Sequence, residues 1–464
     1  MKRFTLLLLV LVMFLAACGG EEEPPAEQPE ATAEGPAVPT EEPETEPEPS
    51  AEEPTLPPPV VEGEETGEEP GEESGEEPGE EPAESPAGEA PAEGAEPGVA
   101  APADAPVFPW PEDRFGYGIQ IHGNATVGSP AETTNTVANQ LGMDWIKMQI
   151  EWPVVHPEPD AAQWFFYDGT IDEANNHGLN VLVSVVGAPE WTRATGGENG
   201  PPDDYQQYVE FLNEMLSRYE GKIHGIEVWN EQNLDREWTT PNGISPEDYV
   251  RFLELSYEAI KAQNSDIIVV SGALSPTGEG DWVRWADDFD YMDRALAAGM
   301  LDYADCVGAH HNGINLPPDV PFEEAGSLEE ASTANFRGPF DNPHHSWSFR
   351  TTLDTYAEKV QAVDPDMKLC VTEFGWASSE GYDTTPENFG FALDNTLEEQ
   401  AQYIVQAFQQ MHDSGNVWLA FLFNFDYGNK GSGPQDDTVP YSILDINGSP
   451  RPAFSAVADM EKAP

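Results

Sequence analysis

The residues best suited to do chemistry lie in two short strings, Trp229-Asn230-Glu231-Gln232-Asn233 and Thr372-Glu373-Phe374-Gly375-Trp376. Each string follows an apolar run, so each places a glutamate at or near the end of a predicted buried strand. Two carboxyl groups held close together can hydrolyse a glycosidic bond. One donates a proton to the leaving oxygen, and the other, ionised, attacks the sugar carbon. Glycoside hydrolysis is therefore the chemistry that this pair predicts.

The two glutamates are far apart in the sequence, so the fold must bring them together. Segments typical of strands and helices alternate along the chain, and eight strands each followed by a helix predict an α/β fold, a single (β/α)₈ (TIM) barrel. A doubly wound open sheet is the alternative, but it usually carries a Gly-rich phosphate-binding turn, and we find none. The predicted strands are Gly116–Gly123, Trp145–Trp152, Asn180–Ala188, Ile223–Asn230, Ile267–Leu274, Cys306–His311, Lys368–Phe374 and Val417–Phe425. The predicted helices are Glu132–Leu141, Tyr167–His177, Asp204–Tyr219, Pro246–Gln263, Trp282–Ala298, Ser348–Val363, Leu397–Asp413 and Pro452–Glu461.

In such a barrel, Glu231 closes the fourth strand and Glu373 lies near the end of the seventh. At these positions the chain resembles clan A of the retaining β-glycoside hydrolases, the cellulase-like and β-xylosidase-like TIM-barrel enzymes. The resemblance implies that Glu231 is the acid/base, that Glu373 is the nucleophile, and that Asn230 hydrogen-bonds the sugar 2-hydroxyl. We also expect the pKa of Glu231 to be raised in a partly apolar, substrate-covered site.

Other strand ends depart from that clan. His310 matches the histidine of a His-x-Tyr group on strand six, but Asn312 stands where the tyrosine is expected, so His310 or Asn312 is the candidate donor to the nucleophile. Lys147 lies on strand two, where many relatives carry an arginine; it is either a partner of the nucleophile or a barrel lysine paired with another carboxylate. Phe425, in place of a tryptophan on strand eight, is a candidate to stack on a sugar, with core packing as the alternative.

Three tryptophans, Trp152, Trp191 and Trp376, come just after predicted strands. Aromatic faces pack against the C–H faces of pyranose rings, so tryptophans around one rim are natural sugar platforms. Each of them alone is as often a loop-packing residue. Together they predict that at least one contacts the substrate.

The N-terminal part differs sharply from the rest. Residues 1–17, with Lys2 and Arg3 before a short apolar run, resemble a secretory signal peptide, and Leu15-Ala16-Ala17-Cys18-Gly19 resembles a bacterial lipobox with Cys18 as the lipidated residue. An ordinary signal peptide with an incidental cysteine is the alternative. Residues 18–105 are rich in Glu and Pro, so we expect a disordered tether. The predicted localisation is therefore the cell envelope, on the extracellular face of a membrane.

The composition of residues 106–464 limits the other partners. This part of the chain is strongly acidic and contains few lysines, which argues against nucleic acid as a partner. The pair His310 and His311 suggests a metal, but no second ligand cluster has suitable spacing, and we expect no metal or other cofactor. Cys306 and Cys370 are expected to be free core thiols rather than a disulfide.

We expect the protein to be a monomer.

Together these patterns predict a retaining hydrolase of β-linked oligo- or polysaccharides, tethered to a membrane by lipid on Cys18. Two alternatives remain. The domain could be a catalytically inactive barrel that binds glycans, or a structural envelope lipoprotein whose tether matters more than its cleft.

Overall fold

The computed structural model describes residues 105–194, 199–429 and 433–463. The predicted signal peptide, Cys18 and nearly all of the predicted tether lie outside the described residues. No helix in the described ranges is long and apolar enough to cross a membrane.

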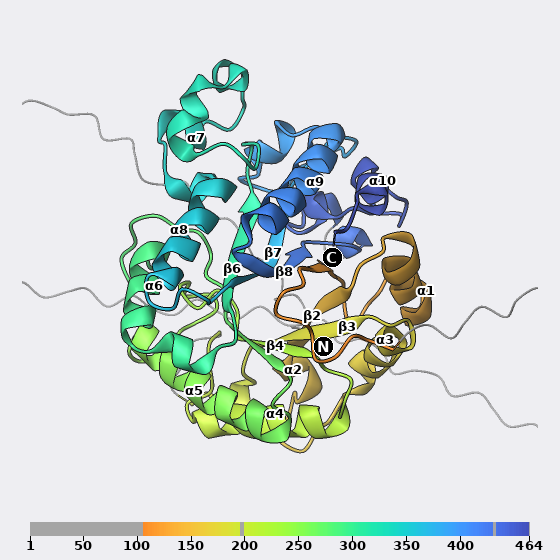
Figure 1. Ribbon diagram of the computed structural model, residues 1–464, viewed down its shortest axis with the longest axis vertical. Helices are drawn as coiled ribbons and strands as arrows, with labels where there is room; N and C mark the ends of the chain where they lie inside the picture. Colours follow the sequence, from red (N-terminus) through yellow and green to blue (C-terminus); the bar gives the residue numbers. More distant parts are fainter. Residues whose placement is uncertain (1–104, 195–198, 430–432, 464) are drawn as a thin grey trace, which may run out of the picture. The chain divides into compact units, whose positions relative to one another are not determined.

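Eight parallel strands form the centre of the fold, with helices around them (Figure 1). The strands pair in the order β5-β4-β3-β2-β1-β8-β7-β6, and bridges from Val270 to Cys306 and from Leu274 to Ala309 join β5 to β6. The prediction of a (β/α)₈ barrel is confirmed. The strands are β1 (Gly116–Gln120), β2 (Trp145–Glu151), β3 (Asn180–Val186), β4 (Gly225–Val228), β5 (Ile268–Ser271), β6 (Val307–Gly313), β7 (Leu369–Trp376) and β8 (Val417–Leu422).

Several helices begin at a residue whose side chain caps them. Ser245 accepts a hydrogen bond from the Asp248 amide before Pro246 opens α5, and Thr396 and Glu399 form a capping box at the start of α9. The α-helices are α1 (Pro130–Asn135), α2 (Trp152–Val155), α3 (Phe165–Asn176), α4 (Tyr205–Arg218), α5 (Pro246–Gln263), α6 (Asp288–Ala297), α7 (Gly338–Asp341), α8 (Phe349–Gln361), α9 (Leu397–Ser414) and α10 (Pro452–Asp459).

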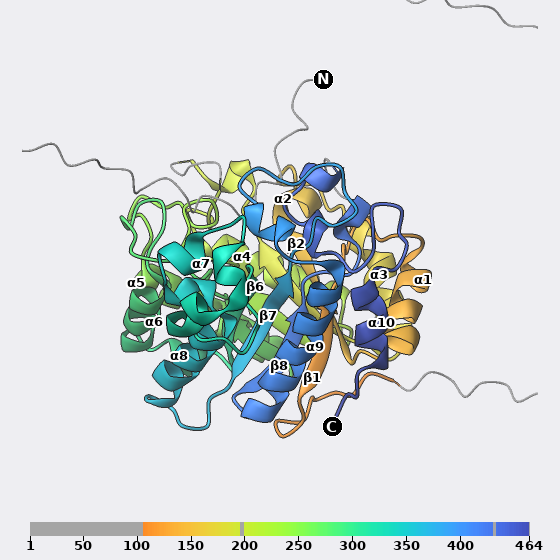
Figure 2. The same ribbon diagram turned by 90° about the horizontal axis from the view of Figure 1, so that it is seen from above.

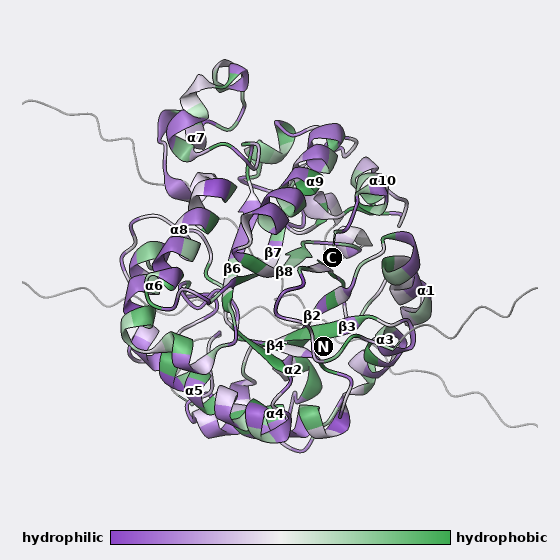
Figure 3. Cartoon of the chain, viewed as in Figure 1, coloured by the Kyte–Doolittle hydropathy of each residue, from purple (hydrophilic) through white to green (hydrophobic). Residues whose placement is uncertain are grey.

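Apolar strands and amphipathic helices form the core. All the side chains of β3, β7 and β8 are buried, and the surrounding helices present mixed hydrophobic and hydrophilic faces (Figure 3). The loop from β6 to α8 contains α7 and several 3₁₀ turns. In the side view, α2, which directly follows β2, lies at the end of the barrel to which the strands run (Figure 2).

The strand before Glu231 ends earlier than predicted. The predicted strand runs to Asn230, whereas β4 ends at Val228, because Trp229 and Glu231 take positive φ values of 78° and 42°. Residues other than glycine rarely adopt this left-handed backbone conformation, and those that do cluster at functional sites. The sharp turn therefore marks the segment that places Glu231.

Cys306 and Cys370 form a disulfide, so the expectation of free thiols is wrong. Val307 pairs with Leu369, which makes the two cysteines neighbours across the start of β6 and β7, with a Cα–Cα distance of 5.8 Å. That distance is typical of a disulfide. The number of cysteines alone could not reveal it, because the pairing depends on the register of two strands far apart in sequence.

Removing this disulfide should weaken the fold measurably. The bond closes a loop spanning 64 positions, and we expect the double variant Cys306→Ala/Cys370→Ala to lose about 2–4 kcal/mol of unfolding free energy. Urea unfolding of wild type and variant, with and without reductant, measures the loss. The reductant should bring the wild type close to the variant and leave the variant unchanged. Equal urea midpoints for the two proteins without reductant would contradict the prediction.

Candidate active site

Four strands bring the predicted chemical residues together at the barrel's C-terminal rim. Glu231 follows β4, Glu373 lies on β7, Lys147 on β2 and His310 on β6, and all four side chains are buried. His310 and Glu373 are direct partners in the pairing of β6 with β7. In (β/α)₈ barrels this is the end of the barrel where active sites are built.

Glu373 is held by one cation and one amide. Lys147 Nζ lies 3.2 Å from its Oε1, and Asn312 Nδ2 donates to its Oε2 at 3.5 Å. Both residues were predicted to lie near Glu373, and the geometry brings them there. His310, the other predicted donor to Glu373, hydrogen-bonds Glu231 instead. Lys147 and Asn312 together fix the orientation of the Glu373 carboxylate.

Lys147 also pairs with a second carboxylate that sequence analysis missed. Its Nζ lies 3.1 Å from Oε2 of Glu227, a fully buried residue of β4 that also accepts hydrogen bonds from Ser184 and from Thr372 at 2.6 Å. Burial lowers the pKa of Lys147, but Glu227 and Glu373 outweigh it and the net shift is upward. Glu227 could have been noticed as the one acid within an otherwise apolar strand.

Glu231 is ion-paired on both sides. Arg236 Nη2 donates to its Oε2, and His310 Nδ1 lies 3.2 Å from its Oε1. Burial alone would raise the pKa of Glu231, but Arg236 and His310 lower it to about 2. The expected raised pKa is therefore wrong for this structure, because the sequence did not reveal that Arg236 folds back onto the glutamate five positions before it.

A fourth carboxyl group, that of Glu237, has its pKa shifted in the opposite direction. Burial raises its pKa to about 8, and Glu231 and Glu373 add to the increase against the opposing charge of Arg236. Arg236 Nε lies 3.9 Å from its Oε1, and Asn230 hydrogen-bonds its side chain. At neutral pH Glu237 is thus the protonated carboxyl group of this cluster. Sequence analysis missed it, since nothing separates Glu237 in type or spacing from a surface acid.

The raised pKa of Glu237 predicts a pH effect on stability. A carboxyl group whose pKa rises on folding contributes stability below its unfolded pKa of about 4.3 and loses it as pH rises through the folded value. We therefore expect the melting temperature of wild type to fall between pH 5 and pH 8.5 by more than that of Glu237→Gln. Thermal melts at both pH values test this, with Glu220→Gln, an exposed glutamate, as the control. Identical pH dependence in wild type and Glu237→Gln would contradict it.

The predicted aromatic platforms are mostly inside the core. Trp152 stacks on Phe211 at 5.1 Å, and Trp376 packs against Phe349 at 5.4 Å. These two tryptophans and Phe425 are 2 % exposed or less, so no ring face is open to a sugar, and their predicted stacking roles are wrong. The sequence showed that they follow strands, but not that their rings turn inward. Trp191 is partly exposed and remains a candidate.

No protein-family model and no curated protein sequence matches the chain. Among solved structures, it is similar to a family 39 glycoside hydrolase from Bacteroides cellulosilyticus WH2 (TM-score 0.51, 19% identity, 75% of this chain and 63% of that one). It is also similar to a monomeric beta-xylosidase from Caulobacter crescentus CB15 (0.51, 17%, 77% and 69%) and to GH5_18 from Streptomyces cattleya in complex with GlcNAc (0.51, 15%, 75% and 80%). The chain thus has the barrel fold of glycoside hydrolases, and it spans less than two thirds of the family 39 enzyme's length.

Proposed function

We propose that this chain is a retaining glycoside hydrolase acting on β-linked oligo- or polysaccharides. Glu373 attacks the anomeric carbon, and Glu231 first protonates the leaving oxygen and then takes a proton from water. The observation that carries the proposal is the pair of buried glutamates after β4 and on β7, each fixed by its own cation. Lys147 and Asn312 suit Glu373 to the nucleophile's role, because they hold its two carboxylate oxygens in place.

Glu231 needs a proton for the first step and none for the second. Its ion pair with Arg236 suits the second step, in which a carboxylate accepts a proton from water. For the first step, we infer that a bound sugar displaces the partly exposed Arg236 side chain. Glu237, which keeps its proton up to a pH of about 8, is the neighbouring carboxyl group from which Glu231 can be protonated.

The side chain of Asn230 has a buried acceptor that a sugar hydroxyl could bind. Its side chain hydrogen-bonds Glu237, while its buried Oδ1 has no hydrogen-bonding partner among the described residues. Buried polar atoms without a partner are rare and call for an explanation. An acceptor left open on the residue next to Glu231 fits the hydrogen bond to the sugar 2-hydroxyl that the family resemblance implies.

The test is a panel of aryl β-glycosides, β-xylosides among them, together with β-glycans. Proton NMR of the first-formed sugar reports the stereochemistry. The proposal predicts hydrolysis of at least one substrate and a β-anomer as the initial product. An initial α-anomer would overturn the retaining mechanism, and no hydrolysis of any substrate would overturn the enzymatic proposal.

One observation favours an inactive glycan-binding barrel as the second candidate. The ion pair between Arg236 and Glu231 holds the acid/base in the form that cannot donate a proton. If glycans bind, as measured by calorimetry, and none is cleaved, this second function replaces the first.

We further propose that the chain is exported and anchored to a membrane by lipid on Cys18. The lipobox-like string before Cys18 and the Glu/Pro-rich stretch after it support this localisation. Expression in bacteria fed a labelled fatty acid tests the proposal. Label should appear in wild type and be lost in Cys18→Ser; equal labelling, or none in either protein, would refute the anchor.

A further inference from the structure

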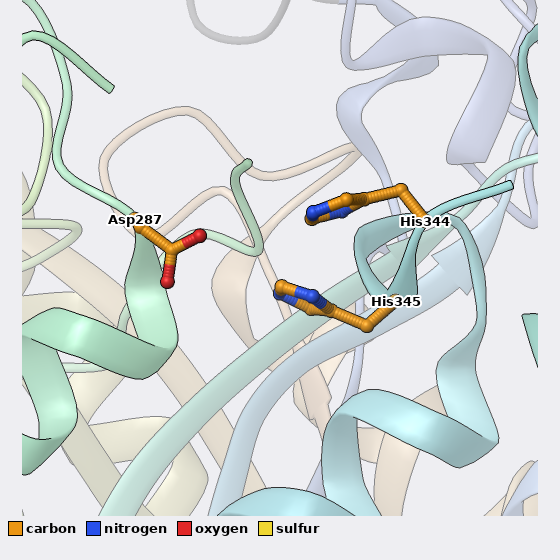
Figure 4. Close-up of side chains that lie close together, drawn as sticks. All are labelled: Asp287, His344 and His345. Atoms are coloured by element: carbon orange, nitrogen blue, oxygen red, sulfur yellow. The ribbon is translucent and has the colours of Figure 1, made fainter. Parts of the chain in front are cut away.

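Three possible metal-binding side chains lie together away from the paired glutamates. They are Asp287, His344 and His345, whose ligand atoms all lie within 4.8 Å of one another. Figure 4 shows the two imidazole rings one above the other, with their edges directed toward the Asp287 carboxylate. Asp287 is the N-cap of α6, and the histidines end the long segment between β6 and α8. The cluster therefore joins two separate loops.

Each of the three side chains keeps one ligand atom open. The Asp290 amide donates to Oδ1 of Asp287 at 3.0 Å, which leaves Oδ2. Nδ1 of His344 accepts from the Ser346 amide at 3.3 Å, which leaves Nε2. Nε2 of His345 is bonded to Asp288, which leaves Nδ1. One oxygen and two imidazole nitrogens form a ligand set typical of Zn²⁺ and similar transition metals.

The fully buried carboxylate of Asp288 fixes one of these histidines. His345 Nε2 lies 2.9 Å from Asp288 Oδ1, and the same carboxylate accepts hydrogen bonds from Tyr356 Oη at 2.5 Å and from the Thr277 amide at 2.9 Å. Phe289 stacks on the His345 ring at 3.6 Å. Metal-binding histidines almost always donate their other N–H to such a carboxylate or carbonyl, which fixes the ring and its tautomer. A buried aspartate in this position points to a metal ligand.

His311 supplies an independent observation. It is 1 % exposed, and neither ring nitrogen has a hydrogen-bonding partner among the described residues. Phe349, four residues after His345 in the chain, packs against its ring at 5.7 Å, so His311 lies close to the segment that carries the two histidines. A buried imidazole with both nitrogens open is an unsatisfied pair of polar atoms, and a nearby cation or its bound water would satisfy it.

We propose that Asp287, His344 and His345 bind a divalent transition-metal ion, with Zn²⁺ the best fit. Two ligands of a tetrahedral Zn²⁺ lie about 3.4 Å apart, since each bond is about 2.1 Å. The ligand atoms, which lie within 4.8 Å of one another, must therefore close by up to about 1.4 Å, and Asp287 and His344, which are only partly buried, have room to move. The remaining position is left to water.

The bound ion ties the start of α6 to the segment that follows β6. That segment leads from β6, the strand that carries His310, to α8. The ion takes no part in hydrolysis, and the proposal does not depend on the function proposed above.

The test is Zn²⁺ titration of the chelator-treated, full-length protein by calorimetry. Excess Ca²⁺ in the buffer occupies carboxylate-only sites, including those of the Glu-rich N-terminal stretch. Asp287→Asn keeps an N-cap acceptor and removes the ligand charge. Its matched control is Asp204→Asn at the N-cap of α4. His344→Ala has His412→Ala, a partly exposed histidine of α9, as its control.

We expect one Zn²⁺ per chain, affinity lowered at least about tenfold in Asp287→Asn and His344→Ala, and unchanged affinity in both controls. Saturating Zn²⁺ should raise the melting temperature of wild type by about 3–5 °C and have little effect on the two ligand variants. Absence of binding at millimolar Zn²⁺, or equal binding by all five proteins, would overturn the proposal.

Discussion

Glu373→Gln is expected to lower kcat on an aryl β-glycoside by about 10⁴-fold or more. The amide has nearly the same shape as the carboxylate and retains an oxygen for Lys147, but it cannot attack the anomeric carbon. Lys147 also keeps its ion pair with Glu227 at 3.1 Å, so the buried charge remains compensated and the fold survives. Steady-state kinetics on the best substrate of the panel measure the loss.

The matched control is Glu387→Gln, which changes an exposed glutamate of the loop after β7. It should leave kcat unchanged. Circular dichroism and a melting curve of Glu373→Gln establish that the protein is folded. A folded Glu373→Gln with more than a tenth of wild-type kcat would remove Glu373 from the nucleophile's role.

Glu231→Ala is expected to show a loss that depends on the leaving group. An activated leaving group such as 2,4-dinitrophenolate departs without protonation, whereas a poor one requires the acid, whose removal costs about 10²–10⁴-fold. Bond cleavage should therefore slow strongly for an unsubstituted phenyl glycoside and much less for the dinitrophenyl glycoside. Pre-steady-state measurement of the released phenol follows that step. Azide, a small anion that fits the vacated space, should restore turnover as a β-glycosyl azide.

Glu237→Gln tests whether Glu237 only supplies protons to Glu231 or is itself the acid/base. If Glu237 only supplies protons to Glu231, its loss should leave activity on the dinitrophenyl glycoside unchanged and move the alkaline limit of activity on the phenyl glycoside to lower pH. The opposite pattern would contradict the assignment of Glu231. In that pattern Glu231→Ala slows cleavage of the phenyl and dinitrophenyl glycosides by the same factor, whereas Glu237→Gln slows the phenyl glycoside much more than the dinitrophenyl glycoside. Glu237 would then be the acid/base.

The barrel and its paired glutamates were predictable because they depend on local patterns. Alternation of apolar strands with helices determines the fold, and the strings around Glu231 and Glu373 follow the fourth and seventh strands. Lys147 and Asn312 were also found beside Glu373 as predicted, since strand ends of one barrel share one rim.

The predictions that the structure contradicts share a different cause. The disulfide depends on the register of β6 against β7, and the low pKa of Glu231 depends on Arg236 folding back past the positive-φ turn at Trp229. The inward-facing ring of Trp376 depends on which side of its strand meets the helices. Each is set by tertiary contacts, which neither residue type nor spacing encodes.

Trapping the covalent intermediate tests the central claim most directly. The protein is incubated with activated 2-deoxy-2-fluoro β-glycosides matched to the substrates that it cleaves, then digested and analysed by mass spectrometry. The account predicts one fluorosugar per chain, attached to Glu373 in the peptide that contains Thr372 and Phe374. A label on Glu231, Glu237 or Glu227, or turnover without any trapped sugar, would contradict it.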